Sequence, residues 1–167
     1  MRRLTRDDLT TQHWMMRSDP QASLEMHNAF IKQHPADPHG YYARHQVLMV
    51  LGHKERALED LNKAISIEPN ATRLEDRGAV LRELGRHREA LEDFNKAEAL
   101  DPEGWKHSFG PLLRADCHAH LGNAEAAVAD CAVLHDEYAV PGVFGFPPGG
   151  KQMLMAEIRR RAAAQKA

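Results

Sequence analysis

The chain contains two segments of nearly the same sequence, LGHKERALEDLNKA at residues 51–64 and LGRHREALEDFNKA at residues 84–97, which lie thirty-three residues apart. Each segment is followed by a proline at the same distance, Pro69 and Pro102. A repeat of this length is typical of helical hairpins that stack on one another, because a single hairpin cannot bury its apolar face alone. The repeat therefore predicts a solenoid of stacked helix pairs rather than one closed domain.

The repeated segments resemble the tetratricopeptide repeat, whose two helices carry large and small residues at fixed places. The later copy holds these places with Leu74, Arg77-Gly78, Leu81, Gly85, Ala90, Phe94, Ala97 and Pro102. The earlier copy holds them with Tyr41, Arg44-His45, Leu48, Gly52, Ala57, Leu61, Ala64 and Pro69. His45 replaces a small residue of the pattern, and Arg77 replaces an apolar one. The resemblance implies an all-α fold, a right-handed superhelix of stacked antiparallel helix pairs.

Two further copies flank the clear ones. A third follows an enlarged loop at residues 103–111 and matches the pattern at Ala115, Leu121-Gly122, Ala127, Cys131 and Leu134. A degenerate first copy fits Leu24, Phe30 and Pro35, and its first helix would contain Leu9, His13, Trp14 and Arg17. The predicted organisation is repeats at 5–37, 38–70, 71–103 and 108–138, a Pro/Gly loop at 139–150 and a capping helix at 151–167.

Capping signals mark the ends of the predicted helices. Asp19-Pro20, Asp37-Pro38 and Asn70 precede apolar-periodic segments, where short polar side chains satisfy free N–H groups and proline loses no hydrogen bond. In the two clear copies and in the third copy, a glycine ends the first helix. A left-handed conformation is expected at this glycine because it lacks the Cβ that would clash. These glycines are Gly52, Gly85 and Gly122.

The last segment, from Lys151 to about Ala164, has apolar residues at helical spacing: Met153, Leu154, Ile158 and Ala162. The pattern favours a helix that caps the last repeat. The alternative is a detachable amphipathic arm that docks into a partner or into the chain's own groove.

Composition narrows the class of protein. Of 167 residues, 43% are hydrophobic and 28% charged, which is typical of a soluble chain, and the net charge of -2 gives no general attraction to nucleic acid. The basic start, Met1-Arg2-Arg3, is not followed by an apolar run, so neither a secretory signal nor a membrane-spanning helix is predicted. Two cysteines without a framework spacing fit a reducing compartment, and we expect the cytoplasm.

The resemblance implies a non-catalytic protein-protein interaction module, because the first helices of such repeats line a concave groove that holds a peptide or partner protein. Projecting the pattern onto this chain predicts a groove lined by Tyr42, Gln46, Met49, Glu75, Asp76, Ala79, Arg82, Leu112 and Asp116. A ligand with apolar anchors and a Lys or Arg opposite Glu75 and Asp76 would complement this surface.

The sequence does not fit one class of partner, the acidic tails of heat-shock chaperones. Family members that hold the acidic tails of heat-shock chaperones use Lys, Asn and Arg at fixed groove positions. Here the corresponding positions hold Tyr42, Gln46, Asp76, Phe109 and Leu113, which would not satisfy two carboxylates.

No catalytic constellation or cofactor motif is found, so an enzyme is not predicted. Two alternatives to a general adaptor stay open: a dedicated bacterial chaperone or immunity-type partner for one protein, and a metal-binding protein. The metal alternative rests on thiolate and imidazole ligands in the third copy, Cys117, His118, His120, Cys131 and His135. Self-association through exposed aromatic side chains is also considered, and these are Trp105, Phe109, Phe144 and Phe146.

Overall fold

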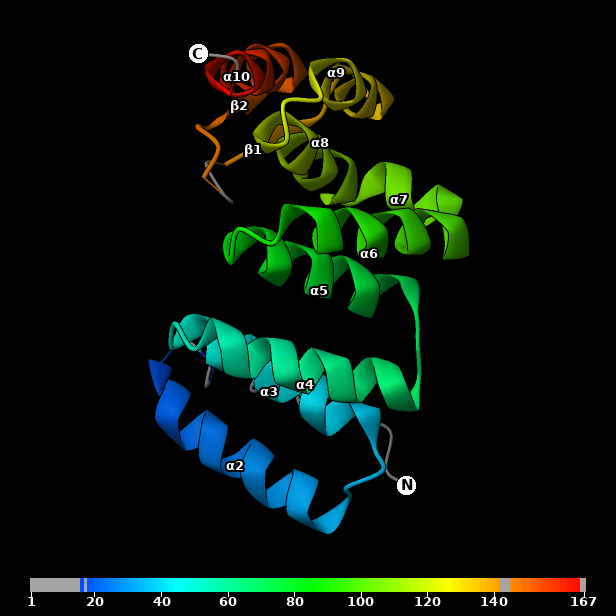
Figure 1. Ribbon diagram of the computed structural model, residues 1–167. Coiled ribbons are helices and arrows are strands. Elements are labelled where there is room, and N and C mark those ends of the chain that lie inside the picture. The colour runs from blue at the N-terminus through cyan, green and yellow to red at the C-terminus, as the bar shows by residue number, and fades with distance from the viewer. Residues whose placement is uncertain (1–15, 17, 142–144, 166–167) are drawn as a thin grey trace. The chain divides into compact units, whose positions relative to one another are not determined.

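The computed structural model describes residues 16, 18–141 and 145–165, and this part of the chain is predominantly helical (Figure 1). Its helices are α2 (Pro20–Gln33), α3 (Pro38–Val50), α4 (Lys54–Ile67), α5 (Ala71–Glu83), α6 (His87–Leu100), α7 (Pro102–His107), α8 (Gly110–His120), α9 (Ala124–Val133) and α10 (Lys151–Ala164). Strands β1 (Ala139–Val140) and β2 (Gly149–Gly150) form a short antiparallel pair. The first helix of the degenerate copy, with Leu9, His13, Trp14 and Arg17, lies outside the described residues. The chain divides into two compact units at Pro69 and Asn70, which are described separately below.

The helices begin where the capping signals predicted. The side chains of Asp19, Asp37 and Asn70 accept hydrogen bonds from the N–H groups of Ala22, His39 and Arg73, at 3.0, 2.9 and 2.8 Å. The three hairpin turns contain glycines with positive φ, 77° at Gly52, 75° at Gly85 and 76° at Gly122. These values confirm the left-handed turns expected from the sequence, in which a side chain would be strained.

The first unit is built on the antiparallel pair α3 and α4, against which α2 packs. Leu24, Val47, Leu48 and Ala57 form its apolar core. His45, which replaces a small residue of the repeat pattern, is buried beside this core. Burial lowers the pKa of His45 to about 4, because the charged ring would lose its solvation, so the buried imidazole is neutral at pH 7.

The second unit contains the pair α5 and α6, which lie close together at Gly78. A Cβ built on Gly78 would lie 2.7 Å from Cε1 of the buried Phe94 ring. The preceding repeat has His45 and Leu61 at the equivalent positions, a larger residue on the first helix and a smaller one on the second. The smaller Leu61 leaves room for His45 in the earlier copy, whereas the larger Phe94 requires glycine in the later one. Such paired changes are tolerated because they keep the total volume of the core.

An arginine on the first helix of each hairpin binds an aspartate sixteen residues later on the second. The three pairs are Arg44 with Asp60, Arg77 with Asp93 and Arg114 with Asp130, each with a shortest N–O distance of 2.6 Å. Arg44 also donates to Asn28 of α2, and Arg114 donates to Asn95 of α6. These arginines therefore link the two helices of a hairpin, and Arg44 and Arg114 also link their hairpins to an earlier helix, α2 and α6 respectively.

The enlarged loop folds differently from the sequence expectation. Residues 102–107 form the short helix α7, and Trp105, expected to be exposed, is only 2% exposed. Its ring lies 6.0 Å from the ring of Phe94 and 4.9 Å from the Arg114 guanidinium carbon. The expectation was wrong for Trp105 because α7 turns this side chain inward, whereas Phe109 is 39% exposed.

The C-terminal helix α10 packs against both α8 and α9 (Figure 1). Its Leu154, Ile158 and Ala162 are buried in one core with residues of α8, α9 and the strand pair, whereas Met153 is exposed. Phe146 belongs to this core, so it does not contribute to an exposed aromatic patch. Phe144 lies outside the described residues. The predicted capping helix is thus present from Lys151 to Ala164.

Enlarging the small residues at the α5–α6 contact should destabilise the protein. We expect Gly78→Val and Ala90→Leu each to lower the free energy of unfolding by about 1–3 kcal/mol, because neither site has room for more atoms. Chemical denaturation measures the change. Ala99→Leu, at an exposed position of α6, is the matched control, and equal stability of all three variants would contradict the packing.

Candidate partner-binding surface

The predicted groove residues of the first unit lie on α3, and one of them, Met49, packs against the apolar core. Tyr42 and Met49 are half-buried and Gln46 is exposed. Their spacing of four and three residues places them on one face of the helix. The Tyr42 ring contacts the ring of His45 at 4.8 Å, which supports its orientation. This face of α3 offers one aromatic, one amide and one thioether side chain.

The predicted groove residues of α5, in the second unit, are all half-buried: Glu75, Asp76, Ala79 and Arg82. Near the Glu75 carboxylate, at the start of α8, the Ser108 hydroxyl donates to the Trp105 carbonyl and accepts from the Gly110 N–H, both at 3.0 Å. Burial raises the pKa of Glu75, and the neighbouring charge of Asp76 raises it further, although the nearby Ser108 and Gly110 oppose the change. This part of α5 therefore carries concentrated negative charge in a partly desolvated position.

The two predicted groove residues of α8 are not available to a partner. Leu112 and Asp116 are both 0% exposed. Leu112 belongs to the core that α8 forms with α9 and α10. Almost every residue of α8 is buried, because α10 packs on it as well as on α9. The sequence showed that the last helix is amphipathic, but its spacing alone did not show that it would cover these two residues.

Asp116 joins three helices through ion pairs. Its carboxylate accepts from Arg82 of α5 at 2.5 Å and from Arg161 of α10 at 2.7 Å. The Arg161 guanidinium also lies 4.3 Å from the centre of the buried Phe146 ring, and its Nη2 donates to the Gly145 carbonyl. A buried carboxylate between two guanidiniums is costly to leave unpaired, so these contacts favour a fixed position for α10.

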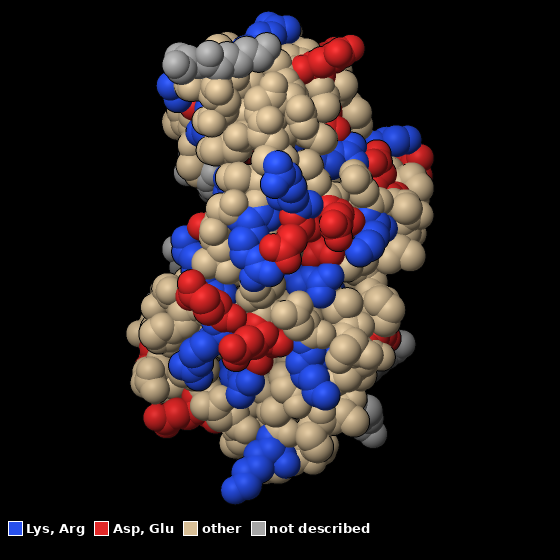
Figure 2. Space-filling view, viewed as in Figure 1, with Lys and Arg blue, Asp and Glu red and all other residues tan. Residues whose placement is uncertain are grey.

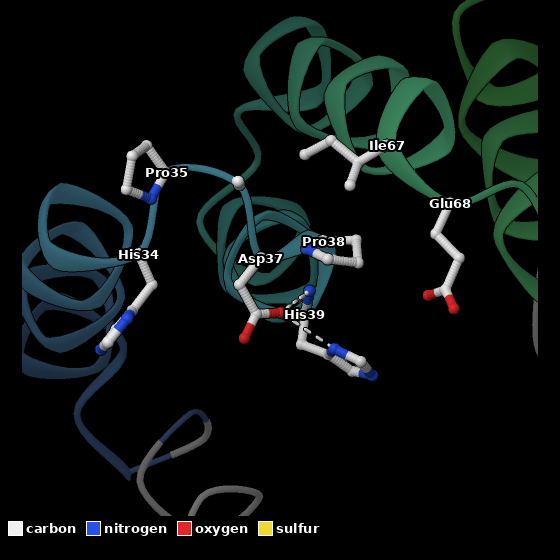
Figure 3. Close-up of a pocket in the computed structure, with 8 residues that line it drawn as sticks. His34, Pro35, Asp37, Pro38, His39, Ile67 and Glu68 are labelled. Carbon is white, nitrogen blue, oxygen red and sulfur yellow. Dashed lines mark hydrogen bonds and ion pairs between the residues drawn. The ribbon is translucent and has the colours of Figure 1, made fainter. Parts of the chain in front are cut away.

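One hollow of the first unit lies away from these residues. It is a cleft of about 650 Å³ at the ends of α2 and α4 and the start of α3, and Figure 3 shows His34 and Pro35 on one side and Ile67 and Glu68 on the other. Asp37 between them receives both the N–H and the ring Nδ1 of His39, at 2.9 and 3.0 Å. The carboxylate of Asp37 already caps α3. The residues of this cleft therefore give no indication of a ligand.

The metal-binding alternative receives no support. Cys117 and Cys131 are buried, and burial raises the pKa of both thiols to about 12, so neither is a thiolate at pH 7. Within the described residues no group of three His, Cys, Asp or Glu side chains is arranged to hold a metal ion. Among the same residues, no helix is long and apolar enough to cross a membrane.

Acidic and basic side chains alternate on the visible face of each unit (Figure 2). Acidic groups in the view are flanked by Lys or Arg, and no extended patch of one sign covers this face. Such a surface fits association with another protein better than association with a nucleic acid backbone.

Comparisons with known proteins identify the repeats. Family models of the tetratricopeptide repeat match residues 71–103 and 40–71. Among solved structures, a MamA fragment from Desulfovibrio magneticus RS-1 has a TM-score of 0.70 and 17% identity over 94% of this chain and 88% of its own. A tetratricopeptide repeat protein from Parabacteroides merdae has a TM-score of 0.71 and 20% identity, covering 93% of this chain and 59% of its own.

A third solved structure, YrrB, has a TM-score of 0.66 and 18% identity over 92% of this chain and 78% of its own. It is described as a TPR protein with an unusual peptide-binding site. No curated protein sequence matches the chain. At these identities the structural likeness shows the fold.

The raised pKa of Glu75 gives a pH-dependent stability. The folded state holds this proton more tightly than the unfolded state, so the contribution of Glu75 is fully present below its ordinary pKa of 4.5 and is lost as pH rises through the folded pKa. We expect Glu75→Gln, which keeps the shape of the side chain and removes its charge, to become more stabilising relative to wild type between about pH 4 and pH 7.

Urea denaturation of wild type and variant at both pH values measures this difference. Glu92→Gln, at an exposed position of α6, removes the same charge without the burial and is the control. A stability difference for Glu75→Gln that is the same at both pH values would contradict the burial of this carboxylate.

Proposed function

We propose that this chain, which belongs to the tetratricopeptide repeat family, is a non-catalytic interaction module that holds a peptide or a partner protein against the first helices of its repeats. The observation that carries the proposal is the open face of two first helices. Gln46 on α3 is exposed, Tyr42 on α3 and Glu75 on α5 are half-buried, and Met49 packs against the apolar core of the first unit at the edge of this face. On the second helices α4 and α6, by contrast, the alanines of the repeat pattern are buried.

The proposed surface is smaller than the sequence predicted. Within the first unit the proposed residues are Tyr42, Gln46 and Met49, and within the second unit a separate set consists of Glu75, Asp76 and Ala79. Arg82 is committed in part to Asp116, and the two residues of α8 are covered by α10. The peptide-binding site described for YrrB supports such a role for a chain of this fold.

The chemistry of the surface suggests its partner. The α3 face offers an aromatic ring and a thioether, which suit apolar anchors, and the α5 face offers two carboxylates, which suit a Lys or Arg. An acidic chaperone tail would meet Asp76 and be repelled. The cytoplasmic location and the dedicated-partner alternative remain predictions from the sequence.

Capture of partners from an extract of the source organism tests the proposal. We expect proteins retained by the wild-type chain to be lost with the double variant Tyr42→Ala/Glu75→Gln, because it removes one apolar anchor and one charge from the proposed surface. Mass spectrometry identifies the retained proteins. One stoichiometric protein would favour a dedicated partner, and several weaker ones a general adaptor.

The double variant Lys63→Ala/Glu92→Gln is the matched control, since both positions are exposed on second helices. Retention of the same proteins by the Tyr42/Glu75 variant, with loss in the control, would show that partners use the second helices instead.

A further inference from the structure

Two histidines of the second unit stack on each other where two successive repeats meet. His87 is the first residue of α6, and His120 is the last residue of α8. Their ring centres lie 4.5 Å apart, and the planes of the rings differ by 18°. His87 is half-buried, whereas His120 remains partly open to solvent. The two rings therefore form a direct contact between the α5–α6 hairpin and the repeat that follows it.

Charged groups from three helices surround this pair of rings. Asp116 lies one turn before His120 on α8, and its carboxylate Oδ1 is 3.3 Å from the His120 Nδ1. The same carboxylate accepts hydrogen bonds from Arg82 of α5 and Arg161 of α10. A charged His120 would thus be paired with Asp116, but it would also face the ring of His87 across the stack.

The position of His87 favours an uncharged ring. Its Nδ1 is buried and has no hydrogen-bond partner among the residues that the structure describes. A protonated imidazole carries a hydrogen on both nitrogens, so a charged His87 would leave one buried N–H group unpaired. At the start of α6, the exposed carboxylate of Glu89 is paired with Arg86.

Electrostatics act on His87 in the same direction. Burial is the main cause that lowers its pKa below the ordinary 6.5, the charge of His120 lowers it further, Asp116 opposes the change, and Arg82 adds to it. The folded state therefore binds this proton less tightly than the unfolded state does. The stability linked to His87 is present above pH 6.5 and is lost as pH falls through the folded pKa.

We propose that the stacked rings of His87 and His120 form a proton-sensitive joint between the α5–α6 hairpin and α8. The rings hold α6 against α8 while at least one of them is neutral. When both are charged, they repel each other, and the buried N–H of His87 lacks an acceptor. Acid then loosens the contact between the two repeats. This inference goes beyond the proposed function, because it concerns regulation within the second unit and involves no partner.

Titration of the histidine side chains, followed by NMR in the full chain, tests whether the rings are coupled. We expect the pKa of His87 to lie below its ordinary value in the wild type and to rise in His120→Gln, because the facing charge is then absent. His107→Gln, at an exposed position of the same unit, is the matched control and should leave the titration of His87 unchanged.

Hydrogen–deuterium exchange at about pH 7.5 and about pH 5.5 tests whether charging the rings loosens the joint. Corrected for the intrinsic rate, exchange in α6 and in the last turn of α8 should be faster at the lower pH, by up to about tenfold per pH unit. The acceleration should be smaller in His87→Phe, which keeps a ring that can stack but cannot take a proton. Comparing the two proteins at the same pH cancels the effects of the other titrating groups.

Three results would overturn the inference: an ordinary pKa for His87, an unchanged titration of His87 in His120→Gln, or equal acceleration of exchange in the wild type and in His87→Phe. A shifted titration without any effect of acid on exchange would also reject the joint, since the rings would then interact without holding the helices. Capture of partners by the Tyr42 and Glu75 residues is a separate measurement, so failure here leaves the proposed function standing.

Discussion

Each repeat depends on a close approach between its two helices, where small side chains meet and an arginine reaches an aspartate. At the α5–α6 contact there is no room for a side chain at Gly78, because Phe94 occupies that space. Beside it, Arg77 pairs with Asp93. Together these contacts fix which face of a first helix turns inward. Tyr42 on α3 and Glu75 on α5, which we propose for partner binding, are only half-buried.

The candidate site is determined more by the segments that depart from the repeat pattern than by the repeats themselves. The inserted helix α7 turns Trp105 inward and builds a cavity beside Glu75. At the other end of the second unit, α10 covers α8 and buries Leu112 and Asp116. The helix α7 thus adds a cavity to the surface of this unit, and α10 covers the part of the surface that lies on α8. The partner surface that we propose for this unit is consequently centred on α5.

The sequence predicted the elements that local chemistry determines. Caps at Asp19, Asp37 and Asn70 and the left-handed glycines of the turns were placed correctly, because both depend on one residue and its immediate neighbours. Arg77 looked like a weak match to the pattern, and only the structure shows its partner sixteen residues later. Trp105 and Asp116 were misjudged because their burial depends on elements outside the repeat, for which the pattern gives no spatial position.

The burial of Leu112 and Asp116 requires that α10 is a fixed part of the second unit. Hydrogen–deuterium exchange of the full chain tests whether it is. If α10 is fixed, the amides of α8 and the inner face of α10 should exchange as slowly as those of α6 around Phe94, through unfolding of the whole unit. Exchange in α8 and α10 that is much faster than in α6 would show that the last helix opens by itself. Leu112 and Asp116 would then return to the partner surface.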